Sequence, residues 1–272
     1  MKNVSSEEIS LKNLSVQFGG VRAVDNFSMT LYPGELVGLI GPNGAGKTTV
    51  FNLITNYIKP TSGEIFFMGK SLLGKSPDEI CRMGISRTFQ NIRLFPQMTA
   101  YENVELGLHN VPHYSLLEAF VRTPRARRAE AETRKRALEL LEMVNLKDFA
   151  GERASSLPYG LQRRLELARA MATSPTLLLL DEPAAGMNED ECNELVKLIR
   201  QIHEHMKYTI IMIEHHMNVV MELCKNSRIY VLNLGSLLAV GSPKEIQTNP
   251  QVIKAYLGER KHARYNSNAG SQ

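Results

Sequence analysis

The sequence predicts an α/β fold in which a helical subdomain is inserted into a sheet core. Strand-like and helical stretches alternate along most of the 272 residues, the pattern of a sheet covered by helices. A glycine-rich loop, Gly41–Thr49, joins an apolar strand to a helix, and a helical pattern fills the middle of the chain. We therefore expect one domain over residues 1–258, a helical subdomain at about 99–172, and a polar, disordered tail at 259–272.

The N-terminal quarter is predicted to be mainly strand. Ile9–Phe18 alternates apolar and polar side chains, and Ala23–Leu31 gives a second strand. A turn at Tyr32–Glu35 then leads into the apolar run Leu36–Ile40, which precedes the glycine-rich loop. Helix-compatible residues follow the loop, and Glu64–Phe67 is the next strand-like run.

Helix-start signals mark the segment that follows. Ser76 precedes a proline at the first helical position, and Gly84–Phe89 is strand-like. Thr99–Glu102 has the form of a capping box, and the pattern stays helical to about Leu146. Within it, Pro124–Val144 is dense in charges of both signs. A solvated amphipathic helix face is favoured for this run over a surface that binds nucleic acid or anionic lipid.

The second half of the chain alternates apolar strands with helices. The long helix Asn188–Met206 begins with an asparagine cap and acidic residues, both of which stabilise a helix start. The other predicted elements are Leu161–Ala172, Thr176–Leu180, Tyr208–Ile213, Met217–Cys224, a hairpin of Arg228–Leu232 with Leu237–Val240, and two short helices near Pro243–Gln247 and Pro250–Leu257.

Composition limits the class of protein and of ligand but does not identify the function. Hydrophobic residues make up 43% and charged residues 22%, which is ordinary for a globular protein. A net charge of +4 suits an anionic ligand or a membrane surface and does not require nucleic acid. The three cysteines are far apart, which predicts neither disulfides nor a zinc site and favours a reducing compartment. The N-terminus lacks a signal-peptide core, and no apolar run approaches the ~20 residues that span a bilayer.

The loop GPNGAGKTT fits the phosphate-binding pattern G-x-x-x-x-G-K-[ST] between a strand and a helix. Glycines let the backbone curl so that N–H groups point at phosphate oxygens, and the following helix directs its positive end at the same anion. Lys47 is expected to reach the β- and γ-phosphates, and Thr48 to ligate Mg²⁺. The alternative, a glycine-rich turn without a ligand, is disfavoured by the strand–loop–helix order. The predicted nucleotide-binding residues here are Gly41, Pro42, Asn43, Gly44, Ala45, Gly46, Lys47, Thr48 and Thr49.

Two acidic residues follow the apolar strand that precedes the long helix. Asp181 stands at the strand end, where it can hold Mg²⁺ directly or through water. Glu182 comes next, and in an extended strand its side chain points to the other side, where it can polarise an attacking water. The alternative is a strand that ends in two solvated acids. Phe18, just before a Gly-Gly turn, can stack on a purine or pack at its strand end, and the residues leave this choice open.

The order of these motifs resembles that of the ATP-binding-cassette (ABC) ATPases over about residues 9 to 258. Gln90 matches the family's Q-loop, and Leu157–Leu161 occupies the place of its LSGGQ signature. His215 matches its switch histidine, although a helix-capping role would be favoured for this residue without the resemblance. The resemblance implies a P-loop NTPase fold of ABC type, with a mixed sheet core, N-terminal antiparallel strands and an inserted helical subdomain.

The resemblance also implies a head-to-tail dimer that sandwiches two ATP molecules with Mg²⁺. Tyr159 and Gly160 would face the γ-phosphate of the partner's ATP. Glu182 would act as general base, His215 would contact the γ-phosphate, and Gln90 would sense Mg²⁺ and the permease. The implied metal ligands are Thr48, Gln90 and Asp181, and the implied permease-facing segment is Asn91–Gln97.

A narrower resemblance is carried by stretches such as RTFQNIRLFPQMTAYENV, LLLLDEPAAGMN and NPQVIKAYLGE. They look like the longer ATPase subunit of branched-chain amino-acid importers. In that family two related ATPases pair under two membrane permeases at the cytoplasmic face of the inner membrane, and an extracytoplasmic binding protein delivers the substrate. The resemblance implies these partners for this chain, leaves a homodimer open, and implies no nucleic acid.

Four residues depart from the family pattern. Pro158 replaces the signature serine and offers neither a hydroxyl nor an N–H, which puts one of the two ATP sites in doubt. Met187 and Asn188 stand where most cassettes have Leu-Asp, and His216 stands where an acid is common. One alternative function is an ATPase for another transported substrate, such as urea or an exported lipid. The other is a cassette ATPase that acts on nucleic acid, favoured only by the basic run Arg125–Arg136.

Overall fold

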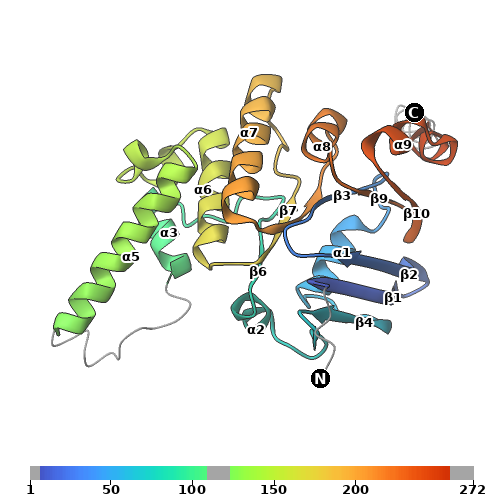
Figure 1. Ribbon diagram of the computed structural model, residues 1–272, viewed down its shortest axis with the longest axis horizontal. Coiled ribbons are helices and arrows are strands. Elements are labelled where there is room, and N and C mark those ends of the chain that lie inside the picture. The colour runs from blue at the N-terminus through green and yellow to red at the C-terminus, as the bar shows by residue number, and fades with distance from the viewer. Residues whose placement is uncertain (1–6, 109–122, 258–272) are drawn as a thin grey trace, which may run out of the picture.

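Two β-sheets and the helices packed around them make up the described part of the chain (Figure 1). This computed structural model describes residues 7–108 and 123–257. The predictions that fall on residues 1–6, on 109–122 within the helical stretch, and on the tail from 258 onward lie outside the described residues. Strands and helices alternate along the rest of the chain, as the sequence predicts.

The first sheet is antiparallel and is built from the N-terminal part of the chain. Its strands lie in the order β2-β1-β4-β5, and β1 pairs antiparallel with both β2 and β4. The predicted N-terminal antiparallel strands are thereby confirmed. The sequence analysis missed the last strand, a two-residue element. The strands are β1 (Ile9–Phe18), β2 (Val21–Leu31), β4 (Ser62–Phe67) and β5 (Lys70–Ser71).

The second sheet has the strand order β10-β9-β3-β8-β7-β6 and is parallel except for the β9–β10 hairpin. Because β3, β7 and β8 run parallel and adjoin, their carboxyl ends meet at one edge, where ligands bind in open α/β sheets. The glycine-rich loop, Asp181 and His215 each lie at one of these ends. The strands are β3 (Leu36–Ile40), β6 (Ile85–Arg87), β7 (Leu177–Asp181), β8 (Thr209–Ile213), β9 (Ile229–Asn233) and β10 (Ser236–Gly241).

The helices begin where the sequence supplies caps. Ser76, Asn188 and Ser242 each accept a hydrogen bond from the backbone N–H three residues on, and the Glu there reaches back in a capping box. Another helix occupies residues 250–257. The named helices are α1 (Lys47–Ile54), α2 (Pro77–Arg82), α3 (Ala100–Leu108), α5 (Pro124–Met143), α6 (Tyr159–Ala172), α7 (Glu189–Met206), α8 (Met217–Leu223) and α9 (Pro243–Thr248), with 3₁₀ turns at Lys147–Phe149 and Ala154–Ser156.

Alternate side chains of the parallel strands enter two separate apolar clusters. In β7, Leu178 and Leu180 pack with α6 and α7, whereas Leu177 and Leu179 pack with α1 and the antiparallel sheet. The same alternation holds in β3 and β8. Burial on both faces explains why these strands are apolar throughout. It also places α1 and α6 on opposite faces of the sheet.

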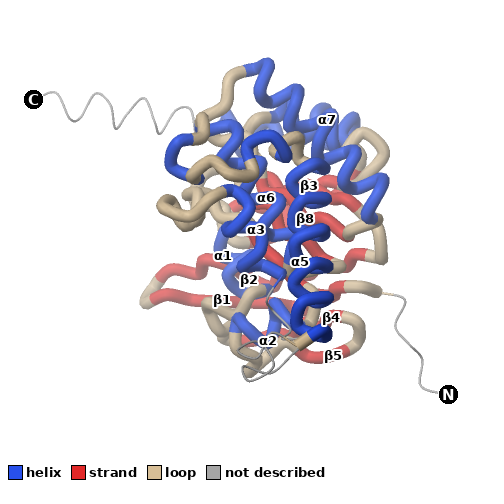
Figure 2. Tube along the Cα trace, turned by 90° about the vertical axis from the view of Figure 1, so that its left-hand side faces the viewer, coloured by secondary structure: helices blue, strands red, loops and turns tan. Residues whose placement is uncertain are grey.

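Helices α3, α5 and α6 pack against one another and lie side by side in Figure 2. Helix α5 ends at Met143, earlier than the predicted end at Leu146. Asn145 there adopts a left-handed φ of 58°, and the N–H of Leu146 closes the helix on the carbonyl of Leu141. No helix in the described ranges is both long and apolar enough to cross a bilayer.

The charged face of α5 is solvated, as the sequence analysis favoured. Glu139 lies 3.9 Å from Lys135 and 3.5 Å from Arg136, and all three side chains are exposed. Leu140 and Leu141 of the same helix are fully buried. Part of the charge on the helix is therefore paired within the helix, while its apolar side chains pack inward.

Candidate functional site

The glycines of the loop between β3 and α1 are required by close backbone contacts. A Cβ atom on Gly41 would lie 2.1 Å from the carbonyl oxygen of Leu232, and one on Gly46 would lie 2.3 Å from that of Ala23. Both glycines have positive φ angles, 153° and 102°. Gly44 also has a positive φ of 73° but faces open space. The loop is thus wedged between the end of β9 and β2.

Lys47 holds the curve of this loop from within. Its buried ammonium donates to the carbonyl oxygens of Gly41, at 2.8 Å, and Pro42, at 2.9 Å. A further loop contact runs from the N–H of Gly235 to the carbonyl oxygen of Ala45. The loop therefore places a cation and the positive end of α1 together, a combination that binds phosphate. Of the remaining predicted residues, Asn43, Gly44 and Thr48 are exposed and Thr49 is half-buried.

The side chains of Glu182, Gln90 and His215 meet beyond the carboxyl ends of the strands. Gln90 Nε2 lies 2.8 Å from Oε2 of Glu182, and His215 Nε2 lies 2.9 Å from Oε1. The prediction that Glu182 continues an extended strand is wrong. Strand β7 ends at Asp181, and Glu182 turns to a left-handed φ of 49° with its N–H on the carbonyl of Ile213. This turn aims Glu182 between the other two side chains.

Asp181 is buried and bound to an arginine that the sequence analysis missed. Its Oδ2 atom lies 2.7 Å from Nη2 of Arg87, whereas its Oδ1 atom is buried without a hydrogen-bond partner among the described residues. Burial raises the pKa of Asp181, and the Arg87 contact opposes that rise. Arg87 also donates to Oδ1 of Asn52, at 2.7 Å, which connects the acid to α1. The signal available in the sequence was an arginine inside a short, otherwise uncharged strand.

A second buried ion pair fixes the backbone around Gln90. Arg163 and Glu166 of α6 lie 3.1 Å apart with side chains only 3% exposed. Arg163 donates to the carbonyl oxygens of Phe89, at 2.6 Å, and Gln90, while Glu166 accepts from the N–H groups of Phe89 and Arg93. Burial raises the pKa of Glu166, and Arg163 opposes the rise. We call this pair the α6 clasp, and sequence spacing alone did not reveal it.

Tyr159 and Gly160 form the first turn of α6, away from the glycine-rich loop. A Cβ atom on Gly186 would lie 3.3 Å from the Tyr159 ring. Pro158 caps this helix with its backbone, because its carbonyl oxygen accepts from the N–H of Leu161 at 2.9 Å. Since α1 and α6 lie on opposite faces of the sheet, one chain does not bring this turn to the loop.

Phe18 ends β1 with its side chain 49% exposed and pairs with Val21 across the turn. Two residues further on, Ala23 touches the loop at Gly46. The aromatic ring therefore stands at the end of β1, and the paired strand β2 borders the loop. No described contact distinguishes purine stacking from packing at the strand end, so its predicted role stays open.

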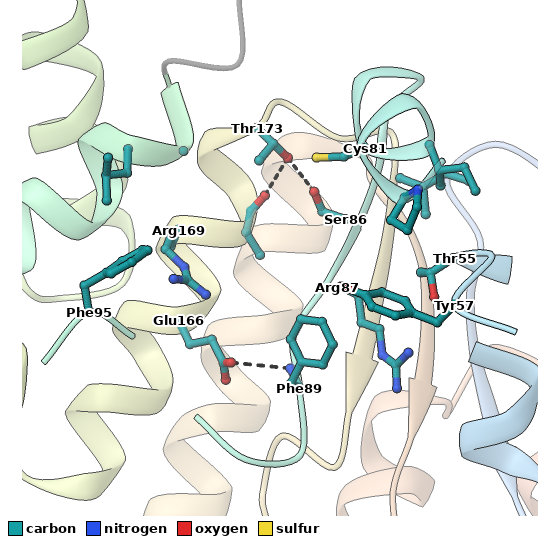
Figure 3. Close-up of a pocket in the computed structure, with 16 residues that line it drawn as sticks. Thr55, Tyr57, Cys81, Ser86, Arg87, Phe89, Phe95, Glu166, Arg169 and Thr173 are labelled. Carbon is teal, nitrogen blue, oxygen red and sulfur yellow. Dashed lines mark hydrogen bonds between the residues drawn. The ribbon is translucent and has the colours of Figure 1, made fainter. Parts of the chain in front are cut away.

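A cavity of about 480 Å³ lies between α6 and the segment around β6 (Figure 3). Arg169 of α6 points into it beside Phe95, and burial lowers the pKa of this arginine. Of the segment predicted to face a permease, Asn91–Gln97, Phe95 lines the cavity. Arg87, the ion-pair partner of Asp181, forms part of the cavity wall. The other labelled residues in Figure 3 are Thr55, Tyr57, Cys81, Ser86, Phe89, Glu166 and Thr173.

Comparison with known proteins places this site in a family. The model described as ABC transporter matches residues 24–185, and that described as branched-chain amino acid ATP-binding cassette transporter matches residues 236–262. The high-affinity branched-chain amino acid transport ATP-binding protein LivG of Escherichia coli (strain K12) is 48% identical over 256 residues, 94% of this chain and 100% of that protein. The corresponding BraF protein of Pseudomonas aeruginosa is 45% identical over 92% of this chain and 98% of its own.

Solved structures agree with this assignment. The ADP conformation of MJ1267, an ATP-binding cassette of an ABC transporter, matches with a TM-score of 0.79 and 28% identity, covering 93% of this chain and 99% of that one. The dimeric post-hydrolysis state of the cassette MJ0796 bound to ADP and Pi matches with a TM-score of 0.72 and 29% identity, covering 86% and 98%. The chain belongs to the ABC transporter family, as one of its ATP-hydrolysing cassettes.

Proposed function

We propose that this cassette energises an importer of branched-chain or similar amino acids from the cytoplasmic face of the inner membrane. Support comes from relatives at 48% and 45% identity whose names specify branched-chain amino acid transport. The family match at residues 236–262 points the same way. In this proposal residues 1–258 form one nucleotide-binding domain, and about 99–172 form its helical subdomain.

Loop 41–49 is proposed to bind the phosphates of ATP. Lys47 then exchanges its contacts with the carbonyls of Gly41 and Pro42 for the β- and γ-phosphates, an exchange that keeps the ammonium paired. The positive end of α1 adds to the attraction. Phe18 is proposed to stack on the base from the neighbouring strand.

Mg²⁺ fits the oxygen donors near Asp181. The buried Oδ1 atom of Asp181 has no hydrogen-bond partner in the described part of the chain, and Thr48 and Gln90 supply a hydroxyl and an amide oxygen. Hard oxygen donors of this kind suit Mg²⁺, which also takes phosphate oxygens and water. When bound, the ion would neutralise charge on the phosphates. The described residues hold no cluster of three His, Cys, Asp or Glu side chains that could bind a metal, so the nucleotide would complete the site.

Glu182 is the proposed general base, and its geometry carries the mechanistic part of the proposal. Gln90 and His215 each donate to one of its oxygens, which fixes the plane of the carboxylate. A carboxylate has about four acceptor positions, so two remain for an attacking water. Glu182 orients and deprotonates that water. His215, which lies at the Oε1 atom of the carboxylate, contacts the γ-phosphate.

The second half of each ATP site is proposed to come from a partner subunit. Tyr159 and Gly160 lie at the start of α6, on the face of the sheet opposite α1. A head-to-tail dimer would bring this turn to the loop of its partner, where helix-terminal N–H groups would bind the γ-phosphate. The structurally similar cassette MJ0796 is dimeric. The partner is a second, related ATPase subunit, and a second copy of this chain is the alternative.

The proposed partners also include two membrane permeases, and an extracytoplasmic binding protein would supply their substrate. A loop of one permease is the proposed occupant of the cavity beside α6. The cavity joins apolar side chains such as Phe95 to the half-buried guanidinium of Arg169. A permease loop with an apolar side chain and a carboxylate complements this lining. Nucleic acid is not an expected partner, and two cations of α5, Lys135 and Arg136, lie beside Glu139 on the same helix.

Affinity purification of tagged Glu182→Gln from solubilised membranes tests the proposal. We expect two multi-span permeases and a related ATPase, identified by mass, and we expect Arg169→Glu to lose the permeases while the ATPase pairing remains. Uptake of labelled leucine by cells carrying the wild-type chain is the matching transport assay. Recovery of DNA with a steep salt dependence, or of soluble partners alone, would contradict the transport function while leaving ATP hydrolysis intact.

A further inference from the structure

A buried carboxylate that the mechanism above does not use lies directly behind the catalytic cluster. Glu214 follows the last residue of β8 and is only 1% exposed. Its Oε1 atom accepts from the backbone N–H of His215 at 2.7 Å, and from the backbone N–H and Nδ1 of His216, both at 3.0 Å. Its Oε2 atom accepts from the N–H of Ala184 at 3.0 Å. All four contacts are made by the segments that carry His215 and Glu182.

The donors to Glu214 come from two separate segments, one that follows Glu182 and one that carries His215. Ala184 lies two residues after Glu182, and His215 adjoins Glu214, so the carboxylate ties together the two segments whose side chains meet at 2.9 Å. Further along this segment, Gly186 faces the ring of Tyr159, which a Cβ atom on the glycine would approach to 3.3 Å. A shift of the segment after Glu182 would therefore move both the catalytic cluster and the first turn of α6.

His216 completes the set of donors and explains a departure seen in the sequence. It begins α8 without a side-chain cap and instead places Nδ1 on Glu214, with the imidazole 48% exposed. An ionised acid at this position could not donate this side-chain hydrogen bond to Glu214. The histidine is thus matched to the buried Glu214.

We propose that Glu214 is a positioning residue for ATP hydrolysis, which holds the His215 segment and the segment after Glu182 at a fixed separation with His216 as its third donor residue. The inference rests on the proposed roles of Glu182 and His215. Removing Glu214 is expected to misplace these two side chains relative to the γ-phosphate while loop 41–49 still binds ATP. The signature is a fall in kcat at nearly constant KM.

The test compares Glu214→Gln with Glu8→Gln in the full chain. Glu8 is a matched control because it is also buried and accepts a hydrogen bond from Thr209, at 2.7 Å, at the opposite end of β8. In Glu214→Gln the amide nitrogen cannot accept from its backbone partner. We expect kcat for Mg-ATP to fall by on the order of tenfold or more, with KM within about twofold. Glu8→Gln should keep both values near wild type.

His216 gives a second, surface-accessible test that does not depend on the fold tolerating a change at Glu214. His216→Asn retains a donor and should keep kcat near wild type, whereas His216→Leu, which has no donor, should lower kcat with unchanged KM. Wild-type kcat in Glu214→Gln would overturn the inference, as would an equal loss in Glu8→Gln. If Glu214→Gln does not fold, wild-type kcat in His216→Leu overturns it. Loss of hydrolysis in Glu182→Gln is scored separately, so that a failure of the proposed catalytic base is distinguished from a failure of Glu214.

Discussion

The imidazole Nε2 of His215 lies 2.9 Å from Oε1 of Glu182, although the two residues are 33 positions apart in the chain. Strands β7 and β8 are neighbours, and Asp181 pairs with Ile213 in the register of the sheet. Glu182, one residue beyond β7, and His215, two residues beyond β8, are therefore brought to the same edge. Glu182 keeps acceptor positions open for water, whereas Asp181 commits one oxygen to Arg87.

Glu182→Gln should bind Mg-ATP with near wild-type affinity and lose most of its hydrolysis. The amide cannot take a proton from water, and general-base catalysis contributes about 10²–10⁴-fold in rate. Titration with a fluorescent ATP analogue and single-turnover hydrolysis measure the two properties. Asp190→Asn changes an exposed acid in the first turn of α7 and serves as the control. Wild-type turnover in Glu182→Gln would remove Glu182 from this role.

Arg87→Met should lower the free energy of unfolding by about 3–5 kcal/mol, because it leaves the buried Asp181 without its ion-pair partner. Loss of Arg87 raises the pKa of Asp181 further, and an acid with a raised pKa in the folded state costs stability as the pH rises. The deficit should therefore be larger at pH 8 than at pH 5. Urea denaturation measures it.

Two comparisons make the Arg87 prediction specific. Arg82→Met removes an exposed ion pair with Asp78 and should cost no more than about 1 kcal/mol. The double variant Arg87→Met with Asp181→Asn should recover part of the loss, because the two residues are coupled. Additive effects in this cycle would show that the pair is not a unit.

Breaking the α6 clasp should release the backbone around Gln90. Arg163→Met removes hydrogen bonds to the carbonyls of Phe89 and Gln90 and leaves Glu166 buried without its cation. Hydrogen–deuterium exchange in peptides covering residues 88–93 should become faster. Arg164→Met is the control, because Arg164 pairs with the exposed side chain of Glu194 instead. Unchanged protection in Arg163→Met would contradict the role of the clasp.

Gly41→Ala should disrupt the loop more than Gly44→Ala. The added methyl group at position 41 would lie 2.1 Å from the carbonyl of Leu232, at a φ of 153°, a clash that has to displace β9 or the loop. At position 44 the methyl group meets open space and the cost is the left-handed backbone alone, about 1–2 kcal/mol. Thermal unfolding of each variant, with and without Mg-ATP, measures the two losses of stability. Equal stability of the two variants would show that the loop relaxes around Leu232.

Cys224 should make the protein less stable in alkali. Burial raises the pKa of its thiol to about 12, so the folded state holds the proton more tightly than the unfolded chain, whose thiol titrates near 8.5. The stabilisation is complete below that pH and is lost as the pH rises toward 12. Between pH 7.5 and 10 the wild type should lose about 2 kcal/mol more than Cys224→Ala. Cys81→Ala, at a part-exposed thiol, should show no such difference.

The sequence by itself determined the elements and the identity of the central motifs. Apolar runs, caps such as that at Asn188, and the glycine-rich loop are local patterns, and local backbone preferences decide them within a few residues. The resemblance of the motif order to that of the ABC ATPases predicted that Gln90, Asp181, Glu182 and His215 serve one site.

The tertiary structure alone decided how that site is held. Arg87 meets Asp181 across 94 positions, and Arg163 reaches the backbone of Phe89 across 74; neither spacing has a local signal. The requirement for glycine at position 41, beside Leu232 of β9, likewise depends on the order of the strands. So does the turn at Glu182, whose N–H bonds to Ile213 of β8. Such contacts follow from strand order and register, and these are fixed by packing of the whole chain rather than by the preferences of any one segment.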